Sequence, residues 1–590
     1  MQKILKQLLL KFKKMKKNKF DIVLLSLILF CFQLTVFSQE VNLEVSGNRE
    51  IEPTYRIVKH PKLIDTLISH SEIHYPLLSL KYETTFSLDT IKSAKIKLID
   101  KLPDLYSSYV KIGIGSKFMP LGEFYHNNLR SRKYLYGVHF KHLSSFGNIK
   151  GYAPSQFDRT NISCFGKLNE TKYSLDGNIH FTSFGLHQYG LRNENIPKDS
   201  IQQRFSDFGT SFNYTKHKHD SLSFNYLVNL KYNYFQDQKS KIDSLKDWYG
   251  RENYVNLNSK AWYKIGKEII SADAGLALNA YKYGIPGKKL TTIDSGFVNT
   301  NIIFNITPTI TTFAKNNRLK VKIGANAALD VVNDNIQPKT KIHLYPDLEL
   351  KYSLFNDILI PYLDIKGGLK QNTFKMLSQE NEFILSQIQL KNESNNINAK
   401  IGLKGALSNR IMFNTALNVG VYKNKALFIN DIIYAGGNQF RVIYDDINVT
   451  TIQGSLIYQM NEKLKIEGIG IFNSYQAKNN IYAWNLPQIQ FIVRGYYKIL
   501  ENLTIKLDAN LEGGRYAKVY TEAESDYEEN LQFAKKLGFI PDLNLSGEYQ
   551  YNKKLSAFIQ VNNFVAQRYK RWYNYPVQGL QLFAGITLKF

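Results

Sequence analysis

Cysteine is scarce in this sequence, with two residues, Cys31 and Cys164, in a chain of 590. That scarcity excludes a disulfide framework and any metal or iron–sulfur site built from cysteines. Common signatures of hydrolytic and phosphate chemistry are also missing, because the chain has no Gly-x-Ser-x-Gly, no His-Glu-x-x-His and no Gly-Lys-Ser/Thr. We therefore expect a protein that is not an enzyme, with no catalytic residues and no cofactor.

Long apolar runs are also few, and the mean hydropathy of −0.30 does not suit a helical membrane protein. The main apolar stretch spans residues 22–37, after eight lysines, and Val36-Phe37-Ser38 suits cleavage before Gln39. Residues 1–38 therefore predict a signal peptide, with Met1 or Met15 as the start. The alternative is an uncleaved anchor helix, which we disfavour because the stretch is short and contains Ser26, Gln33 and Thr35.

Acidic residues are too few to balance the basic ones, since 76 Lys and Arg stand against 50 Asp and Glu, a net charge of +26. A basic chain raises the possibility of nucleic-acid binding. Export argues against that partner, and the charges are spread along the chain rather than clustered. Disorder is excluded by the composition, because 44% of the residues are apolar and 13% are aromatic.

After residue 105 the chain repeats segments in which apolar and polar residues alternate, which is the pattern of β-strands. In residues 503–512 every odd position is apolar and every even position is polar. A soluble sandwich would turn the apolar face toward a second sheet. A membrane barrel would turn it toward lipid and line the lumen with the polar face. Alternation alone does not separate these two folds.

The spacing of turns does separate them. Ten short polar turns recur, at Arg130-Ser131-Arg132, Asn169-Glu170, Lys218-His219, Gly266-Lys267, Asn316-Asn317-Arg318, Asn356-Asp357, Ser408-Asn409-Arg410, Asn461-Glu462-Lys463, Glu501-Asn502 and Asn552-Lys553-Lys554. Longer stretches lie between them, at 146–156, 186–202, 238–247, 285–296, 371–392, 423–445, 515–533 and 567–576. Short turns at one end and long loops at the other are typical of outer-membrane barrels. We predict an all-β, transmembrane antiparallel β-barrel of about 22 strands, allowing for 20.

The end of the chain carries the sharpest signal. Apolar residues alternate with others up to an aromatic terminus, at Leu580, Leu582, Ala584, Ile586, Leu588 and Phe590. A closing strand with a terminal aromatic resembles the signature that the barrel-assembly machinery reads. We therefore expect Leu582, Ala584, Ile586, Leu588 and Phe590 to act as the barrel-assembly signal, with their side chains facing outer-membrane lipid.

Residues 543–590 resemble the end of a TonB-dependent receptor barrel. Residues 555–564 are similar to its penultimate strand, and Tyr569, Trp572, Tyr575-Pro576, Gly579 and Gly585 fit its last loop and strand. The resemblance implies a barrel of about 22 strands around a plugged lumen. The family's N-terminal plug exceeds a hundred residues, whereas only residues 39–105 are available here.

These features predict three parts: a signal peptide at 1–38, an extended segment at 39–105 that is periplasmic or fills the lumen, and an outer-membrane barrel at 106–590. The expected function is a transporter or receptor for a solute at the outer membrane of a Gram-negative bacterium. A barrel that serves as an assembly, secretion or adhesion platform is the alternative. A separate plug, a surface lipoprotein or an energy-coupling partner could complete it, and residues 371–392 and 423–445 are long enough to fold inward.

Candidate binding residues are weak. An acidic cluster could hold Ca²⁺ through its oxygens, although a solvated loop is the simpler interpretation. The cluster consists of Glu522, Glu524, Asp526, Glu528 and Glu529. The segment His217-Lys218-His219-Asp220 could bind a transition metal, but a plain turn is favoured.

Several other side chains have a second interpretation. His139 and His142 are expected near the extracellular end of a strand, with no acid nearby to form a catalytic pair. Three aromatic residues could stack on a ligand, and they are Trp572, Tyr573 and Tyr575. A place in the aromatic girdle at the membrane interface is favoured for them. Cys164 is expected to be a small buried or lipid-facing residue.

Overall fold

The computed structural model describes residues 105–129, 131–216, 224–239, 249–284, 296–334, 338–355, 357–432, 437–519 and 533–590. The predicted signal peptide, nearly all of the segment 39–105, the acidic cluster and the His217 turn lie outside these ranges. In the part of the chain that is described, no helix is long and apolar enough to cross a membrane.

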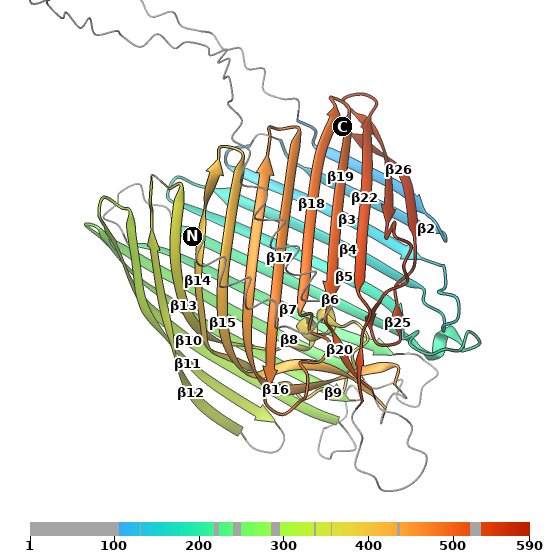
Figure 1. The fold of residues 1–590 in the computed structure, drawn as a ribbon, viewed down its shortest axis with the longest axis horizontal. Helices are drawn as coiled ribbons and strands as arrows, with labels where there is room; N and C mark the ends of the chain where they lie inside the picture. The colour runs from blue at the N-terminus through green and yellow to red at the C-terminus, as the bar shows by residue number, and fades with distance from the viewer. Residues whose placement is uncertain are drawn as a thin grey trace, which may run out of the picture. The chain divides into compact units, whose positions relative to one another are not determined.

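One closed antiparallel sheet of 22 strands makes up most of the described part of the chain, which confirms the predicted fold (Figure 1). Each barrel strand pairs with the next barrel strand along the chain, and β1 pairs with β26 to close the ring. Backbone hydrogen bonds of 2.8 and 3.0 Å join Ser108 to Phe590 at this closure. Two small hairpins, β20–β21 and β24–β25, stand apart from the barrel sheet.

The barrel strands in the first half of the chain are β1 (Ser108–Gly115), β2 (Met119–Asn127), β3 (Tyr134–Ser145), β4 (Phe157–Asn169), β5 (Tyr173–His187), β6 (Gln202–Lys216), β7 (Asn225–Lys239), β8 (Tyr249–Ile265), β9 (Glu268–Gly284), β10 (Gly296–Ala314) and β11 (Leu319–Asp334). Those in the second half are β12 (Pro338–Tyr352), β13 (Leu359–Lys370), β14 (Glu393–Ser408), β15 (Ile411–Asp431), β16 (Gln439–Gln459), β17 (Leu464–Ala477), β18 (Ile489–Leu500), β19 (Leu503–Gly513), β22 (Ile540–Gln550), β23 (Leu555–Asn562) and β26 (Gln581–Lys589). The remaining elements are η1 (Lys198–Ser200), α3 (Phe374–Glu380), β20 (Tyr516–Val519), β21 (Phe533–Lys536), β24 (Lys570–Trp572) and β25 (Tyr575–Pro576).

Side chains alternate across the barrel wall as the sequence predicts, because successive residues of a strand point to opposite faces. On β26 the outward row includes Leu582, Ile586 and Leu588, which are 50%, 53% and 44% exposed. The terminal Phe590 is 52% exposed on the same row. An outward apolar row of this kind is the surface that a lipid-facing barrel requires.

The two ends of the barrel differ as expected. The start of β1 and the end of β26 lie at the short-turn end, together with the tight hairpins such as the one between β10 and β11. There Lys315, Asn316 and Asn317 adopt positive φ angles of 50°, 56° and 66°. Short polar residues such as Asn tolerate that conformation. The opposite end, which we call the long-loop end, carries connections such as 146–156, 188–201, 371–392, 478–488 and 563–580.

One predicted loop is wrong. Residues 423–445 are not a long loop, because β15 and β16 stay paired as far as Asp431 and Gln439. Their extension buries Leu427, Ile429 and Ile447 in a cluster with Trp484 from the connection 478–488. Packing against that connection stabilises the extra strand residues, and the sequence between the strands did not reveal it.

Candidate functional site in the barrel lumen

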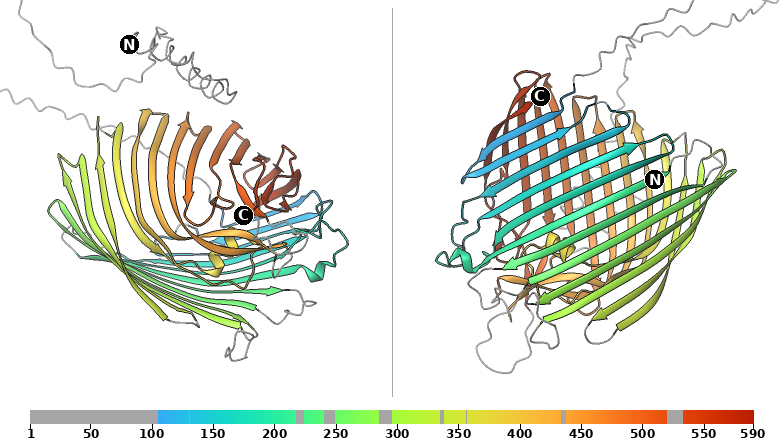
Figure 2. Two further views of the ribbon diagram at one scale, coloured as in Figure 1. Left: turned by 60° about the horizontal axis from the view of Figure 1, so that its bottom comes forward. Right: turned by 180° about the vertical axis from the view of Figure 1, so that it is seen from behind.

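Residues 371–392, which connect β13 to β14, fold into the lumen at the long-loop end. We call this segment the inner loop, and Figure 2 shows its helix α3 between the two walls of the barrel. Thr373 begins the helix, and its hydroxyl accepts a hydrogen bond from the Met376 N–H at 3.1 Å. Apolar side chains hold it in place, since Phe374, Ile384 and Leu390 are fully buried. The prediction that this segment could fold inward agrees with its position.

Carboxylates on the inward faces of the strands bind the inner loop. Glu252 of β8 accepts the N–H groups of Phe374 and Lys375 at 2.6 and 2.9 Å. The same carboxylate accepts a hydrogen bond from the side chain of Asn279 at 2.9 Å. Lys375 also forms an ion pair of 2.7 Å with Asp207 of β6. Charge-assisted bonds of this kind are stronger than neutral ones, so the start of α3 is firmly fixed to the wall.

Polar contacts continue along the loop. The hydroxyl of Ser386 donates to the carboxylate of Asp237 of β7. The backbone carbonyl of Ser386 accepts a hydrogen bond from the hydroxyl of Tyr281. At the two ends, Gln371 donates to the carbonyl of Asn301 at 2.8 Å, and Asn392 donates to Asp330 at 2.7 Å. Strands from β6 to β11 therefore share the attachment. A displaced inner loop would take hydrogen bonds away from several buried carboxylates, which would keep only their partners on the wall, such as Asn279 for Glu252 and His180 for Asp207, and that loss is costly.

Aromatic packing covers the other side of the inner loop. The ring of Phe383 stacks on Tyr575 of the last connection, with 3.6 Å between centroids. Tyr189 meets both rings edge-on, at 5.5 and 4.9 Å. Backbone hydrogen bonds of 2.8 and 2.9 Å also tie Leu385 and Phe383 to Phe440 of β16. The inner loop is thus held from both sides of the lumen.

A cavity of about 740 Å³ lies beneath this assembly, between the inner faces of β3–β5 and those of β19, β22 and β23. Its lining includes the carboxylates of Glu382, Asp508 and Asp542 and the guanidinium of Arg159. Arg159 and Glu382 approach to 4.0 Å. Desolvation by the atoms around it raises the pKa of the Glu382 carboxyl, although 40% of the side chain remains exposed, and Arg159 and Arg571 oppose that rise. Charged and amide groups give the cavity a hydrophilic wall.

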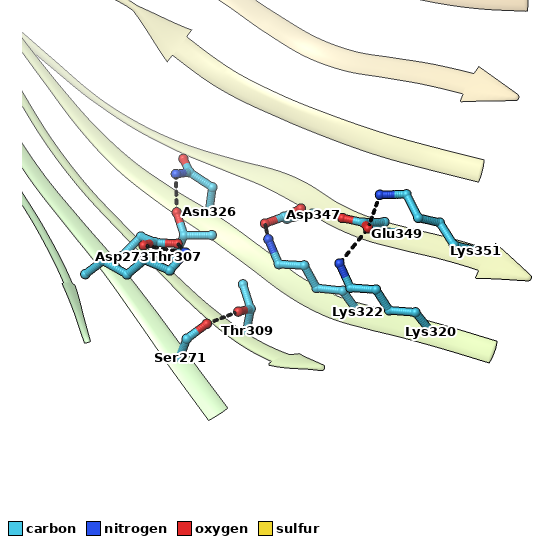
Figure 3. Close-up of polar contacts among 11 residues, drawn as sticks. Ser271, Asp273, Thr307, Thr309, Lys320, Lys322, Asn326, Asp347, Glu349 and Lys351 are labelled. Carbon is cyan, nitrogen blue, oxygen red and sulfur yellow. Dashed lines mark hydrogen bonds and ion pairs between the residues drawn. The ribbon is translucent and has the colours of Figure 1, made fainter. Parts of the chain in front are cut away.

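Toward the short-turn end the inner wall carries a ladder of opposite charges. Figure 3 shows Lys320 and Lys322 of β11 reaching carboxylates of β12, at 2.7 Å from Glu349 and 2.6 Å from Asp347 respectively. Lys320 stands directly across from Lys351 in the ladder, and Glu349 pairs with both lysines. Like charges in register would repel, so the diagonal carboxylate offsets that repulsion. Neighbouring strands add the Ser271–Thr309 and Asn326–Thr307 hydrogen bonds, both 2.6 Å.

Comparison with known proteins gives a fold but no sequence relatives. No protein-family model matches the chain, and no curated protein matches it. Among solved structures, the FrpB iron transporter from Neisseria meningitidis matches with a TM-score of 0.63 and 9% identity, over 83% of this chain and 82% of that one. The siderophore receptor PirA from Acinetobacter baumannii has a TM-score of 0.62 at 10% identity, with coverages of 83% and 81%. The ferric-catecholate import receptor Fiu from E. coli K12 has a TM-score of 0.59 at 10% identity, with coverages of 83% and 82%.

The barrel has the TonB-dependent receptor fold. The resemblance first suggested by residues 543–590 is therefore confirmed at the level of the fold, and it extends over most of the chain. At these identities the match says nothing about which solute the barrel handles.

Within this TonB-dependent receptor fold, some predicted site residues lie elsewhere than expected. Trp572 and Tyr575 are 9% and 1% exposed in the aromatic cluster over the inner loop, so they form neither an interfacial girdle nor an open stacking platform. Tyr573 is half-buried, with the ammonium groups of Lys535 and Lys570 at 5.3 and 5.9 Å from its ring. Strand alternation could not reveal this packing, because the rings belong to a connection.

The histidine prediction needs a correction. His139 has an acid nearby, because its Nε2 lies 2.8 Å from Glu123 of β2, whose carboxylate also accepts from the hydroxyl of Tyr109 at 2.7 Å. The hairpin register brings these side chains to one face, and the register was not known from the sequence. His142 bonds Thr160 at 2.8 Å instead. Cys164 is a free, exposed cysteine, in line with a lipid-facing position.

The acidic cluster and the His217 turn cannot be placed, because both lie outside the described ranges. Among the residues that are described, no group of three or more His, Cys, Asp or Glu could hold a metal ion. The residues that sequence reasoning missed are Asp207, Asp237 and Glu252. Their signal is an isolated inward acid near the long-loop end of three neighbouring strands, which can be recognised only once the strand faces are assigned.

Proposed function

We propose that the protein is an outer-membrane transporter that admits a solute through its lumen, with the inner loop as the closing element at the outer end. Transport is supported by the charged and amide lining of the lumen, which suits a polar solute better than a sealed structural barrel would. The neighbours in fold are described as an import receptor, an iron transporter and a siderophore receptor. Their solutes are not carried over to this chain.

The observation that carries the proposal is the attachment of the inner loop to Glu252 and Asp207. Both carboxylates lie on the lumen wall, and the loop contacts them through reversible hydrogen bonds and an ion pair. A solute could enter if these bonds exchanged for others. Passage would rest on lumen polarity and loop motion, without covalent chemistry.

The proposal includes a cellular location and partners. The signal peptide would be cleaved near Ser38, and the barrel-assembly machinery would insert the barrel into the outer membrane of a Gram-negative bacterium. The segment 39–105, a separate plug or a surface lipoprotein would complete closure of the lumen, and an energy-coupling protein could drive opening. The platform function is the alternative, and the charged luminal wall weighs against it.

Single-channel conductance in planar bilayers tests the proposal. We expect the full chain to be closed, and the Glu252→Gln/Asp207→Asn variant to show openings, more frequent when residues 39–105 are also removed. Glu123→Gln is the matched control, because Glu123 faces the lumen but binds Tyr109 and His139 rather than the inner loop. If none of these forms conducts current although each is correctly folded, a gated lumen is excluded and the platform function is favoured.

A further inference from the structure

The barrel wall is incomplete between β12 and β13. The ladder joins Asp347–Lys351 of β12 to Tyr362–Lys366 of β13 and then stops. Beyond that point Pro338–Pro346 of β12 remains paired with β11 on its other side. The end of β13 follows β14 instead, up to the Lys370–Glu393 pair. We call this opening the seam; in Figure 1 β12 diverges there from the strands that follow it.

Two features of the sequence create the seam. The N–H of Ser353 points toward β11 and donates to the carbonyl of Arg318, just before that strand. The N–H of Leu354 points toward β13 and donates to the carbonyl of Leu359. Because N–H directions alternate along a strand, the backbone N–H of a residue at position 346 would have to donate toward β13. Proline has no N–H to donate, so Pro346 cannot continue the ladder.

The other side of the seam begins with a bulge at Gly367 and Gly368 of β13. A Cβ at Gly367 would lie 2.8 and 2.9 Å from the carbonyl oxygens of Asn396 and Asn395, and 2.9 Å from the Cβ of Tyr345. Only glycine fits there, and the bulge turns β13 toward β14. The seam is therefore encoded in both strands and is not a frayed end.

The edge of the seam is apolar on its outer face. The outward row of β12 contains Ile342, Leu344, Pro346, Leu348 and Leu350. Ile342 and Leu344 are 82% and 75% exposed, far more than the outward residues of paired strands such as Ile323, at 59%. A tilted strand crosses the hydrocarbon in about 9–11 residues, so the open edge reaches membrane depth. An unpaired edge in hydrocarbon is unfavourable unless something covers it.

The inner side of the seam is basic. A cavity of about 560 Å³ lies against β13–β15, and its lining includes Lys366, Lys370 and Lys400 together with the two acids Asp364 and Glu393, so the lysines are in excess. Glu393 of the same cavity pairs with Lys425 at 3.7 Å. For the three cavity lysines, no ion pair is found among the described residues. Tyr345 and Ser394 bridge the seam between β12 and β14 through a hydroxyl contact of 2.7 Å.

We propose that the seam is a lateral binding site for an anionic amphiphile. Its hydrocarbon tail lies along Ile342 and Leu344 on the lipid side, and its anionic head group binds Lys366, Lys370 and Lys400 inside the wall. The tail packs against the exposed side chains of Ile342 and Leu344, and the head group binds the lysines, which outnumber the carboxylates of the cavity lining. The inference rests on the membrane placement proposed above, but it does not require a solute to pass along the barrel axis.

Titration calorimetry of the full chain in nanodiscs of phosphatidylcholine tests this site with three probes, each also titrated into empty nanodiscs. Octyl phosphate supplies a tail and an anionic head, inorganic phosphate supplies the head alone, and octyl glucoside supplies the tail with an uncharged head. We expect octyl phosphate to bind at least tenfold more tightly than either of the others. Equal binding of inorganic phosphate would mean a site for a free anion and would overturn the proposal.

Substitutions locate the binding. Lys366→Gln/Lys370→Gln/Lys400→Gln should weaken the binding of octyl phosphate at least tenfold, whereas Lys465→Gln/Lys506→Gln, in a separate luminal cavity at β17–β19, should change it less than twofold. Ile342→Gln should weaken it several-fold, and Ile323→Gln, on a fully paired outward position, should not. Unchanged binding in the lysine variant, or a polypeptide strand found bound at the seam by mass spectrometry, would contradict the proposal. The measurement involves no conductance, so it can fail independently of the transport proposal.

Discussion

Glu252 holds the first backbone N–H of α3, because its carboxylate lies 2.6 Å from the Phe374 nitrogen although 122 residues separate them in the sequence. The carboxylate is 1% exposed, and its second oxygen binds the N–H of Lys375. A buried charge with this many donors stabilises one position of the inner loop. The same bonds are the ones that must break if the loop moves.

Replacing Glu252 by Gln should loosen the inner loop. Hydrogen bonds to a charged group contribute about 1.5–3 kcal/mol, and an amide would keep one acceptor oxygen where the carboxylate has two. We expect hydrogen exchange of the amides of Phe374 and Lys375 to accelerate about tenfold or more. Glu123→Gln should leave these amides unchanged, and equal protection in the Glu252 variant would mean that packing alone seats the loop.

The binding of the inner loop to the barrel wall should depend on pH through the carboxyl group of Glu382. Partial desolvation raises the pKa of this carboxyl when the inner loop is bound to the wall, so the bound state favours the protonated form. The resulting stabilisation is complete below the ordinary carboxyl pKa of about 4.3 and is lost as the pH rises through the raised value. After correction for intrinsic exchange, amide protection of residues 383–385 should therefore fall as the pH rises.

Two variants check the cause of that pH dependence. Glu382→Gln should remove it, because the amide does not titrate. Arg159→Gln should move it to higher pH, since Arg159 opposes the rise in the pKa of Glu382. The same pH profile in Glu382→Gln as in the unchanged protein would assign the effect to another group.

Arg515 should be a structural requirement for the last connection. Its guanidinium, 2% exposed, donates to the carbonyls of Arg571 and Lys570 at 2.5 and 2.9 Å. Burial lowers its pKa to about 10, so the group stays charged at neutral pH. Arg515→Met would leave both carbonyls without this donor, at a cost of about 2–3 kcal/mol. Limited proteolysis should then cut residues 563–580 faster, whereas Arg568→Met, at a more exposed position of that connection, should show the ordinary rate.

Phe590 should be needed for assembly of the barrel. Its ring continues the outward apolar row of β26, and its backbone closes the ring of strands against Ser108. Deletion of Phe590, or its replacement by Asp, should lower the amount of protein in the outer-membrane fraction several-fold. Tyr551→Asp, at an exposed aromatic residue of a short turn, is the control. Normal levels of the Phe590 variants would contradict a role in the assembly signal.

The strand pattern and the short turns could be read from the sequence because they are local. Residues 503–512 alternate strictly, and a period of two has one structural solution, a strand with two different faces. Asn316 and Asn317 mark a tight turn for an equally local reason, since their side chains tolerate positive φ. Repetition of this unit was sufficient to predict a barrel of about 22 strands.

The candidate sites needed the tertiary structure, because they join residues that are far apart in the chain. Glu252 and Phe374 meet only when a connection folds back into the lumen, and His139 meets Glu123 only in one register of a hairpin. Pro346 and Gly367 are visible in the sequence, but their effect depends on which strand edge each one faces. Side-chain periodicity is set by neighbouring residues, whereas register and loop placement are set by the closed sheet as a whole.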